Sequence, residues 1–434
     1  MKKKFLALIM VALFLAVMPV VKAAEEPTYV DDRTIATKPL FFANGTPITI
    51  EERTDGEEGA LIKWNGGEKL VTKNTNIYGA GHESDTRYET TSITMNGGNV
   101  NDIFGGGLHK SNVGTVNIII NEGTYNSVSG GGSASGGSTN CSHKYNGDVN
   151  QSPTRVEKVT IIINGGTSAT TVFGGGEGIS YTETANIIIN DGKMNWVTAG
   201  GSNGYTGKAS ISVLGGTITT LQSVNRGSME TTDMTVKGGK ITDLVGGTKG
   251  TGTIDSVKIA VEGGDVANLL VGTIGEARNS AKDVVKVSYN KKYVENVDER
   301  TFNEDAIMQT VTLTFVAEGE SESIEVPYGI AFSQEEVDEL INTLKEELKA
   351  EGYTIDDFYQ DEALTTKYNL TKPIEEDTTI YMKLVELKSE TPAPQEVKNA
   401  KTGDMNLIMV LSLLGVAGVA VVLTGKKALL NNNI

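Results

Sequence analysis

The sequence predicts a mainly β protein in which a solenoid of stacked parallel strands is followed by a small α+β domain. Three observations lead to this fold class. The segment "ITMNGGNVNDIFGGG" at residues 93–107 returns as "IIINEGTYNSVSGGG" and again as "IIINGGTSATTVFGGG". Apolar β-branched residues alternate with other residues inside each copy, which indicates strands with one buried face. The glycine-rich pattern stops near Met308 and an amphipathic helical pattern follows it.

Residues 1–23 have the three parts of an export signal. Three lysines come first, an apolar run extends from Phe5 to Val21, and small residues follow, so we expect cleavage after Ala23. An N-terminal membrane anchor is the alternative, but the apolar run is at the short end of what spans a bilayer. Residues 24–60 are expected to cap the first turn of the solenoid, because an open end exposes an unpaired strand edge.

Residues 61–300 are predicted to form about eight rungs of the solenoid. The copies follow one another at about 23 to 26 residues, a spacing at which one repeat makes one turn. Stacking equivalent residues in columns then buries one continuous core. A degraded copy at residues 286–297 is expected to close the far end. The alternating apolar pairs of the first strand are Ile93/Met95, Ile118/Ile120, Ile161/Ile163, Ile187/Ile189, Ile211/Val213, Met234/Val236 and Ile259/Val261.

Glycine and asparagine mark the corner between the two strands of each rung. A corner that needs positive φ or has no space for a Cβ selects glycine. The recurring glycines are Gly67, Gly98, Gly123, Gly166, Gly192, Gly216, Gly239 and Gly264. Two residues earlier stand Asn65, Asn96, Asn121, Asn164 and Asn190, whose amides can hydrogen-bond one another when stacked. This pattern resembles the asparagine ladder of the pectate-lyase-like superfamily, and the resemblance implies a right-handed parallel β-helix.

Residues 308–386 form a separate module in the sequence. The strand pattern at 311–316, the Pro327-Tyr328-Gly329 turn and the segment from Asp377 to Tyr381 resemble the small β-grasp-like repeat of Listeria and Bacteroides surface proteins, including internalin B-type repeats. Between these strands a helix is expected, with Ser333 and Glu336 as its capping box. Its apolar face consists of Val337, Leu340, Ile341, Leu344 and Leu348.

The C-terminal part is predicted to hold the protein at the cell envelope. Residues 387–402 are a linker and a sorting motif, and residues 403–434 contain the apolar stretch Leu407–Thr424 and a basic tail. The motif resembles the Leu-Pro-x-Thr-Gly signal of Gram-positive surface proteins; its residues are Asn399, Ala400, Lys401, Thr402 and Gly403. The resemblance implies that a sortase attacks the Thr402 carbonyl and joins the protein to peptidoglycan. A single transmembrane anchor is the alternative.

Composition excludes several classes of function. The formal net charge of −17 argues against nucleic acid as a partner. Cys141 is the sole cysteine, so no intrachain disulfide is expected. The sequence has no phosphate-binding loop, nucleophile triad or nicotinamide fingerprint, and we expect no cofactor.

Two sets of residues are candidates for binding. His82 and His109 follow the glycine corners of adjacent rungs, and Cys141 and His143 lie in an insertion at the next corner, so these four residues are a candidate metal site. A chance arrangement is the alternative. Tyr88, Tyr145, Tyr181 and Tyr205 are candidates for stacking on sugars or peptides, and packing over loop backbone is the alternative for them.

Acidic residues do not form a catalytic pair in the repeat. Enzymes with a parallel β-helix that cleave acidic polysaccharides place carboxylates on neighbouring rungs. Asp102 and Asp243 occupy equivalent positions, but four other rungs separate them. At about 4.8 Å per rung the two are roughly 24 Å apart, which is too far for a glycosidase pair. We therefore predict that the protein is not an enzyme.

The predicted function is that of an extracellular, cell-surface binding or adhesion protein anchored to the wall or membrane of a Gram-positive bacterium. Its solenoid loops are expected to present the binding surface, and the expected partner is a host or environmental glycan or protein. A surface polysaccharide lyase or glycoside hydrolase is one alternative. A structural surface spacer is the other.

Overall fold

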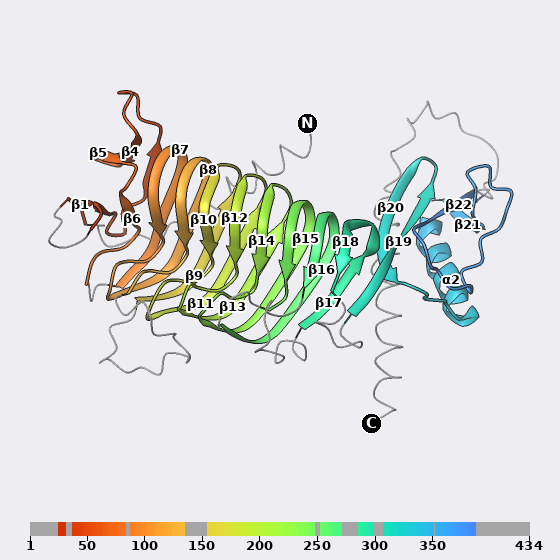
Figure 1. The fold of residues 1–434 in the computed structure, drawn as a ribbon. Helices are drawn as coiled ribbons and strands as arrows, with labels where there is room; N and C mark the ends of the chain where they lie inside the picture. Colours follow the sequence, from red (N-terminus) through yellow and green to blue (C-terminus); the bar gives the residue numbers. More distant parts are fainter. Residues whose placement is uncertain are drawn as a thin grey trace, which may run out of the picture. The chain divides into compact units, whose positions relative to one another are not determined.

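The computed structural model describes residues 25–31, 37–83, 87–134, 154–247, 252–270, 285–298, 307–350 and 352–387 (Figure 1). The chain divides into two compact units, one of residues 1–287 with 293–307 and one of residues 288–292 with 308–434. The predicted signal peptide, the sorting motif and the apolar stretch Leu407–Thr424 lie outside the described residues. Among the residues described, no helix has the length and apolar character needed to cross a membrane.

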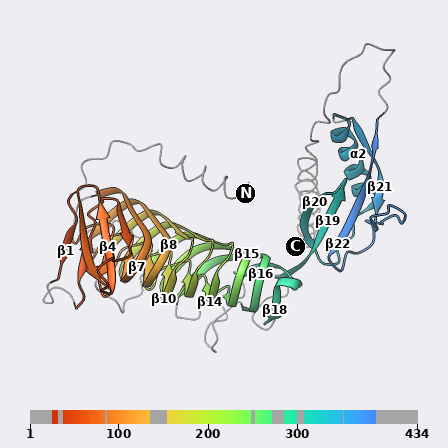
Figure 2. The ribbon, with the colours of Figure 1, turned by 90° about the horizontal axis from the view of Figure 1, so that it is seen from above.

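The first unit is a β-solenoid of about seven turns. Its strands lie in parallel and in register, so Ile118 pairs with Ile93 on one side and with Ile161 on the other. Figures 1 and 2 show the strands following one another as successive rungs. The strands of the rungs are β7 (Arg87–Phe104), β8 (Ser111–Ser129), β9 (Thr154–Ile163), β10 (Thr167–Phe173), β11 (Ser180–Ile189), β12 (Lys193–Thr198), β13 (Tyr205–Val213), β14 (Thr217–Gln222), β15 (Ser228–Val245) and β16 (Thr253–Leu270).

Columns of apolar side chains fill the interior of the solenoid. Burying one such side chain contributes about 1.5 to 3 kcal/mol, so the columns carry most of the driving force for stacking. In the second strand of the rungs the small Ser168 stands in register beside Tyr125, which is among the largest fully buried side chains. The first column consists of Ile93, Ile118, Ile161, Ile187, Ile211, Met234 and Ile259, all with at most 3% of their surface exposed. The predicted alternation is therefore confirmed.

The predicted glycine corner is also confirmed in seven rungs. Gly216 has φ +84°, and a Cβ built on it would lie 2.8 Å from the carbonyl oxygen of Gly192 in the preceding rung. Any larger residue would thus meet backbone that cannot move without shifting the whole rung. The corner glycines with φ between +81° and +110° are Gly98, Gly123, Gly166, Gly192, Gly216, Gly239 and Gly264.

An asparagine ladder runs beside these glycines. The side-chain nitrogen of Asn121 donates to the amide oxygen of Asn96 at 2.7 Å, Asn164 donates to Asn121 at 2.8 Å, and Asn190 donates to Asn164 at 2.7 Å. The next rung has Leu214 at the equivalent place, which ends the ladder because leucine has no hydrogen-bonding group. Four of the five predicted asparagines are therefore joined.

The fifth asparagine, Asn65, was wrongly assigned to a rung. It lies in the two-residue turn between β4 (Gly59–Trp64) and β5 (Gly67–Thr72), which pair antiparallel as a hairpin. An Asn-Gly pair between two strands is itself a strong hairpin signal, and it overrides the similarity to the repeat. Gly67 likewise belongs to this hairpin.

Parallel stacking begins earlier than residue 61, where the solenoid was expected to start. β3 (Ile48–Glu51) pairs parallel with β7, and β2 (Leu40–Phe42) pairs parallel with β6 (Asn76–Tyr78), which in turn pairs with β7. β1 (Thr28–Val30) lies antiparallel to β2 and covers that edge. At the other end β18 (Val294–Val297) adds to β16 in parallel, in the segment where a degraded copy is predicted.

Among its described residues from 307 onward, the second unit contains four strands that pair with one another and one helix. Its strands are β19 (Ile307–Ala317), β20 (Glu320–Pro327), β21 (Tyr353–Tyr359) and β22 (Thr378–Glu386). β19 pairs antiparallel with β20 and parallel with β22, and β21 pairs antiparallel with β22. The remaining strand β17 (Val285–Asn290) is divided between the units: its first three residues belong to the first unit, and its last three belong to the second together with Lys291 and Lys292 of the 3-10 turn η2 (Lys291–Tyr293).

Helix α2 (Gln334–Ala350) begins at the predicted capping box. The Ser333 amide nitrogen donates to Glu336 Oε2 at 2.7 Å, and the Glu336 amide nitrogen donates to Ser333 Oγ at 3.2 Å. These reciprocal bonds satisfy backbone donors that have no partner inside the helix. The apolar face of α2 packs against the unit's own core, with Val337, Leu344 and Leu348 buried there.

Candidate functional site

A row of side chains follows the glycine-rich turns at residues 79–81, 105–107, 130–132 and 174–176, along one edge of the solenoid. Residues in equivalent positions form isolated parallel bridges from His82 to Leu108, from Leu108 to Ser133 and from Ser133 to Glu177. Backbone hydrogen bonds hold these turns, because the Leu108 nitrogen donates to the Gly81 oxygen and the Ser133 nitrogen donates to the Gly107 oxygen. Neighbouring turns are therefore about 4.8 Å apart, close enough for their side chains to meet.

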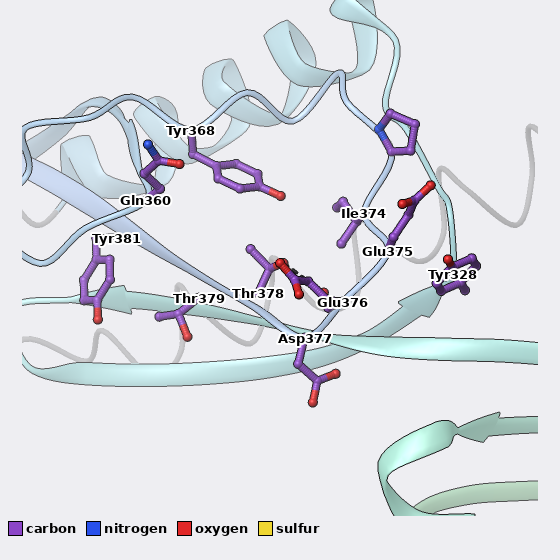
Figure 3. Close-up of a pocket in the computed structure, with 11 residues that line it drawn as sticks. Tyr328, Gln360, Tyr368, Ile374, Glu375, Glu376, Asp377, Thr378, Thr379 and Tyr381 are labelled. Carbon is purple, nitrogen blue, oxygen red and sulfur yellow. Dashed lines mark hydrogen bonds between the residues drawn. The ribbon is translucent and has the colours of Figure 1, made fainter.

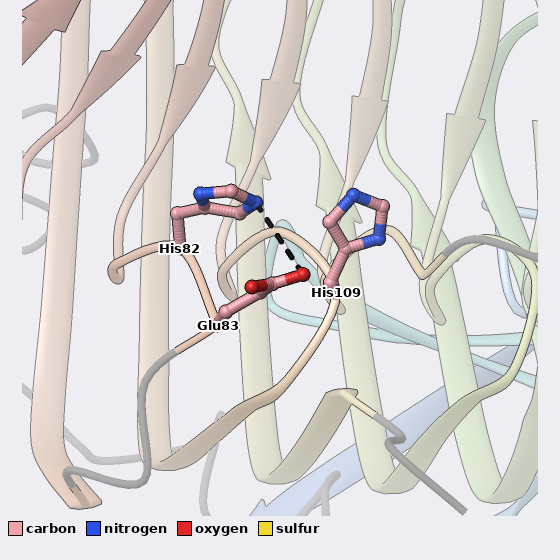
Figure 4. A group of neighbouring side chains, drawn as sticks. All are labelled: His82, Glu83 and His109. Carbon is pink, nitrogen blue, oxygen red and sulfur yellow. Dashed lines mark ion pairs between the residues drawn. The ribbon is translucent and has the colours of Figure 1, made fainter. Parts of the chain in front are cut away.

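His82, Glu83 and His109 come together at this edge (Figure 4). One ligand atom of each lies within 4.8 Å of those of the other two, and His82 Nε2 is 4.0 Å from Glu83 Oε1. The two imidazole rings have centroids 5.3 Å apart. The structure thus brings together the two predicted histidines that it describes. Cys141 and His143, the other two predicted ligands, lie outside the described residues.

Glu83 was missed in the sequence analysis, although it directly follows His82. Glu83 directly follows the bridge residue His82, and His109 directly follows Leu108, the bridge residue of the next rung. The two side chains therefore leave equivalent positions of successive turns. Both residues have positive φ, at 45° for Glu83 and 63° for His109, and Gly178 occupies the equivalent place two rungs further on with φ 64°. The pair is recognisable only once the turn positions are aligned.

The surroundings of His109 favour its neutral form. Burial lowers the pKa of His109 first, the charge of His82 lowers it further, and the charge of Glu83 opposes both. A neutral imidazole is the form that coordinates metal ions. The ring of His82 in turn stacks on Phe42, with centroids 5.8 Å apart and planes at 18°.

Glu177, in the same row, is a second unusual group that the sequence analysis did not identify. Burial raises the pKa of Glu177 to about 7, the charge of Asp102 raises it further, and Ser133 and Lys38 oppose the shift. Asp102 itself accepts hydrogen bonds from Asn126 and Ser127 at 2.7 Å each. A carboxyl that titrates near neutral pH can act as a proton donor or acceptor.

The predicted column of Asp102 and Asp243 is in register as expected. Successive pairs along the column are Asp102–Ser127, Ser127–Thr171, Thr171–Trp196, Trp196–Thr220 and Thr220–Asp243. Five intervals of about 4.8 Å separate the two aspartates, so they are roughly 24 Å apart along the stack. They are too distant to act on one bond.

Three of the four candidate tyrosines are packed into the solenoid wall. Tyr88, Tyr181 and Tyr205 have only 8%, 9% and 8% of their surface exposed. The Tyr205 hydroxyl hydrogen-bonds Glu230, and the rings of Tyr181 and Tyr205 have centroids 6.2 Å apart. At these exposures a ring offers little area for stacking, so the structure does not support a binding role for these three. Tyr145 lies outside the described residues.

The second unit carries a groove that sequence analysis did not find. It has a volume of about 720 Å3 and is open to solvent. Tyr328, Tyr368 and Tyr381 line it together with a run of acidic residues, as Figure 3 shows. Tyr328 is 47% exposed, which is unusual for so large a side chain. The lining residues are Tyr328, Gln360, Tyr368, Pro373, Ile374, Glu375, Glu376, Asp377, Thr378, Thr379 and Tyr381.

Hydrogen bonds fix the acidic end of this groove. Asp377 accepts from Lys292 Nζ at 2.8 Å and from the Thr312 amide nitrogen at 2.7 Å. Burial raises the pKa of Asp377, the bonds from Lys292 and Thr312 lower it, and the net shift is downward. Burial raises the pKa of the Tyr368 phenol, so this group remains a hydrogen-bond donor at neutral pH. The groove therefore offers aromatic rings, a phenolic donor and carboxylate acceptors on one surface.

The comparisons with known proteins do not assign the chain to a family. No protein-family model, no curated protein and no solved structure matches it.

Proposed function

We propose that this chain is a non-catalytic binding or adhesion protein displayed on the surface of a Gram-positive bacterium. The groove of the second unit carries the proposal, because the exposed ring of Tyr328 and the half-buried rings of Tyr368 and Tyr381 lie beside polar acceptors and are suited to hold a sugar or a peptide. The solenoid provides a rigid scaffold of stacked rungs. This proposal moves the binding surface from the solenoid, where three of the four candidate tyrosines are buried, to the small unit.

The cell-surface location rests on sequence patterns at the two ends of the chain. Residues 1–23 would direct export, and the segment from Asn399 to Gly403 with the apolar stretch Leu407–Thr424 would attach the protein to peptidoglycan through a sortase or to the membrane directly. Loss of wall-associated protein after replacement of Thr402 and Gly403 by alanine would support sorting. An unchanged wall fraction would favour a membrane anchor, which deletion of 403–434 would release.

The topology of the second unit supports its proposed kinship with β-grasp-like surface repeats. Two antiparallel pairs, β19 with β20 and β21 with β22, join through a parallel pairing of β19 and β22. Helix α2 connects the first pair to the second along the chain. The regular corners and the asparagine ladder support the proposed right-handed parallel β-helix. Both proposals concern scaffolds that display a binding surface. The ligand itself is expected to bind in the groove.

The decisive experiment measures binding and turnover by the same preparation. The full chain is applied to arrays of glycans and peptides, and any bound compound is analysed afterwards by mass spectrometry. Binding without product, reduced at least about tenfold by Tyr328→Ala, supports the proposal. Leu387→Ala is the matched control, because Leu387 is an exposed apolar residue of the same unit outside the groove, at 41% exposure. Equal losses in both variants, or no binding, would contradict it.

A second candidate function is cleavage of an acidic polysaccharide at the solenoid edge. The observation that favours it is Glu177, whose pKa of about 7, raised by burial and by the charge of Asp102, suits proton transfer near neutral pH. Release of unsaturated or reducing sugar ends from uronic polymers, abolished by Glu177→Gln, would establish this activity. If the chain shows neither binding nor turnover, the third possibility, a structural spacer, is favoured.

A further inference from the structure

Two successive turns, one after Gly81 and one after Gly107, place two imidazoles and a carboxylate side by side on the outside of the first rungs. His82 and Glu83 come from the turn after β6, and His109 comes from the turn after β7, one rung further along. Their ligand atoms lie within 4.8 Å of one another. The solenoid core does not include these side chains, since Glu83 and His82 are 69% and 34% exposed at the side chain. His82 and Glu83 are therefore accessible to an ion from solvent.

The backbone holds the three residues in place before any ligand arrives. The Glu83 nitrogen donates to the Leu108 oxygen at 3.1 Å, and the His109 nitrogen donates to the Ser133 oxygen at 2.6 Å. On its far side the His82 ring stacks on Phe42, which belongs to a buried cluster with Tyr78 and Phe104. One histidine is thus fixed by an aromatic stack, and the other is fixed by its turn.

We propose that His82, Glu83 and His109 bind one zinc ion. Two nitrogen ligands and one carboxylate are a common donor set for this metal. Bonds of about 2.0 to 2.1 Å in a tetrahedral site place ligand atoms about 3.3 Å from one another. The ligand atoms, which lie within 4.8 Å of one another, must therefore close by about 1.5 Å at most, through small side-chain rotations of the two histidines and of the exposed Glu83. The fourth position stays open for water or for a donor atom of a bound molecule.

Zinc would join two successive turns of the solenoid at its N-terminal end. His82 and Glu83 precede His109 by a whole rung, so one ion ties together segments that otherwise meet through backbone hydrogen bonds. Because the assembled site is present in the folded state, zinc should bind that state more tightly than the unfolded chain, so saturating zinc is expected to stabilise the first unit by mass action. The site is independent of the tyrosine groove, which belongs to the second unit.

Zinc titration of the full chain tests the proposal. The chain is first dialysed against a chelator, and ZnCl2 is then added in a calorimeter. We expect one ion per chain and a rise in the midpoint of thermal unfolding. His82→Ala, His109→Ala and Glu83→Gln are each expected to weaken zinc binding by about 100-fold or more, since each removes a ligand. Cobalt(II) in place of zinc should give a visible absorption band that His109→Ala removes.

Two variants serve as matched controls. His143→Ala and Cys141→Ser remove the same kinds of donor from outside the proposed set, and both are expected to bind zinc as the parent chain does. Circular dichroism verifies that each variant is folded; Glu83→Gln changes only an exposed side chain and keeps its shape. Absence of one-to-one binding, unchanged binding in the three variants, or loss of binding in the His143→Ala variant would each overturn the proposal.

Discussion

Individual glycines decide where each rung turns. At Gly216 two demands coincide, a φ of +84° and a gap to the preceding rung that leaves no room for a Cβ. Gly56 has nearly the same φ, +82°, but no atom outside its two adjacent residues lies within 4 Å of the place where its Cβ would be. The two residues therefore separate the cost of backbone conformation from the cost of stacking.

Alanine substitutions at these two glycines should have different effects. Gly56→Ala is expected to lower the free energy of unfolding by about 1 to 2 kcal/mol, the cost of a left-handed conformation. Gly216→Ala should cost about 1 to 3 kcal/mol more, because the new Cβ overlaps the backbone of the preceding rung. Urea unfolding of both variants measures the difference. Equal losses would mean that the rungs separate easily at the corner.

Glu177 should make stability depend on pH. Its pKa is about 7 in the folded protein against an ordinary value of 4.5. Between these values the folded state keeps a proton that the unfolded state has released, so the free energy of unfolding falls as pH rises. The stabilisation is complete below about pH 4.5 and is lost as pH passes 7, with a magnitude on the order of 3 kcal/mol.

Replacing Glu177 by glutamine removes a titrating group while keeping the side-chain shape. We expect the Glu177→Gln variant to lose less stability than the parent chain between pH 5 and pH 8, as measured by urea unfolding at several pH values. Glu183→Gln, at an exposed position of β11, is the control and should leave the pH profile of the parent chain unchanged. A parallel profile for the two variants would argue against a buried, protonated Glu177.

At the scale of elements, the rungs are joined by side chains as well as by backbone. Each inner asparagine of the ladder both donates to one neighbour and accepts from the other, as Asn121 does with Asn96 and Asn164. Such a side chain links three successive rungs. The hairpin of β4 and β5 shows the opposite case, since an asparagine in nearly the same local sequence there serves a turn between antiparallel strands.

Removing an inner ladder residue should therefore affect two contacts. Asn121→Ala is expected to lower the free energy of unfolding by about 1 to 2 kcal/mol, because two hydrogen bonds are lost at a solvent-accessible site. Asn190→Ala removes the end of the ladder and one bond, so its effect should be about half as large. Chemical denaturation compares the two. An equal or smaller effect for Asn121→Ala would show that the ladder does not contribute to stability.

At the scale of the whole molecule, the chain has two units with separate cores. The core of the second unit includes Leu313, Phe315, Phe358 and Ile380, and the solenoid has its own interior columns. The proposed zinc site belongs to the first unit and the proposed binding groove to the second. Loss of one is therefore not expected to remove the other.

Separate cores predict separate unfolding. Ile187→Ala, in the middle of the solenoid with 0% exposure, should destabilise the first unit by about 2 to 5 kcal/mol. Phe315→Ala, with 3% exposure, should do so for the second unit by about 3 to 5 kcal/mol. Scanning calorimetry of the full chain should show two transitions, each shifted by one substitution alone. A single transition shifted by both would mean that the units unfold together.

The sequence by itself determined the features that repeat. The alternating columns, the glycine corner, four members of the asparagine ladder and the capping box of α2 were all predicted and are present. A repeat of one turn places equivalent residues above one another, so sequence spacing translates directly into distance. The helix cap depends on residues three positions apart and is local in the same sense.

The tertiary structure decided which residues are neighbours wherever the one-turn repeat does not place them. It placed Asn65 in a hairpin, buried Tyr88, Tyr181 and Tyr205, and joined Glu83 to the two histidines. It also buried Glu177 near Asp102, a residue 75 positions earlier in the chain, and formed the groove around Tyr328. These features depend on burial and on contacts between distant segments, and the free energies that govern them come from the folded environment rather than from local sequence.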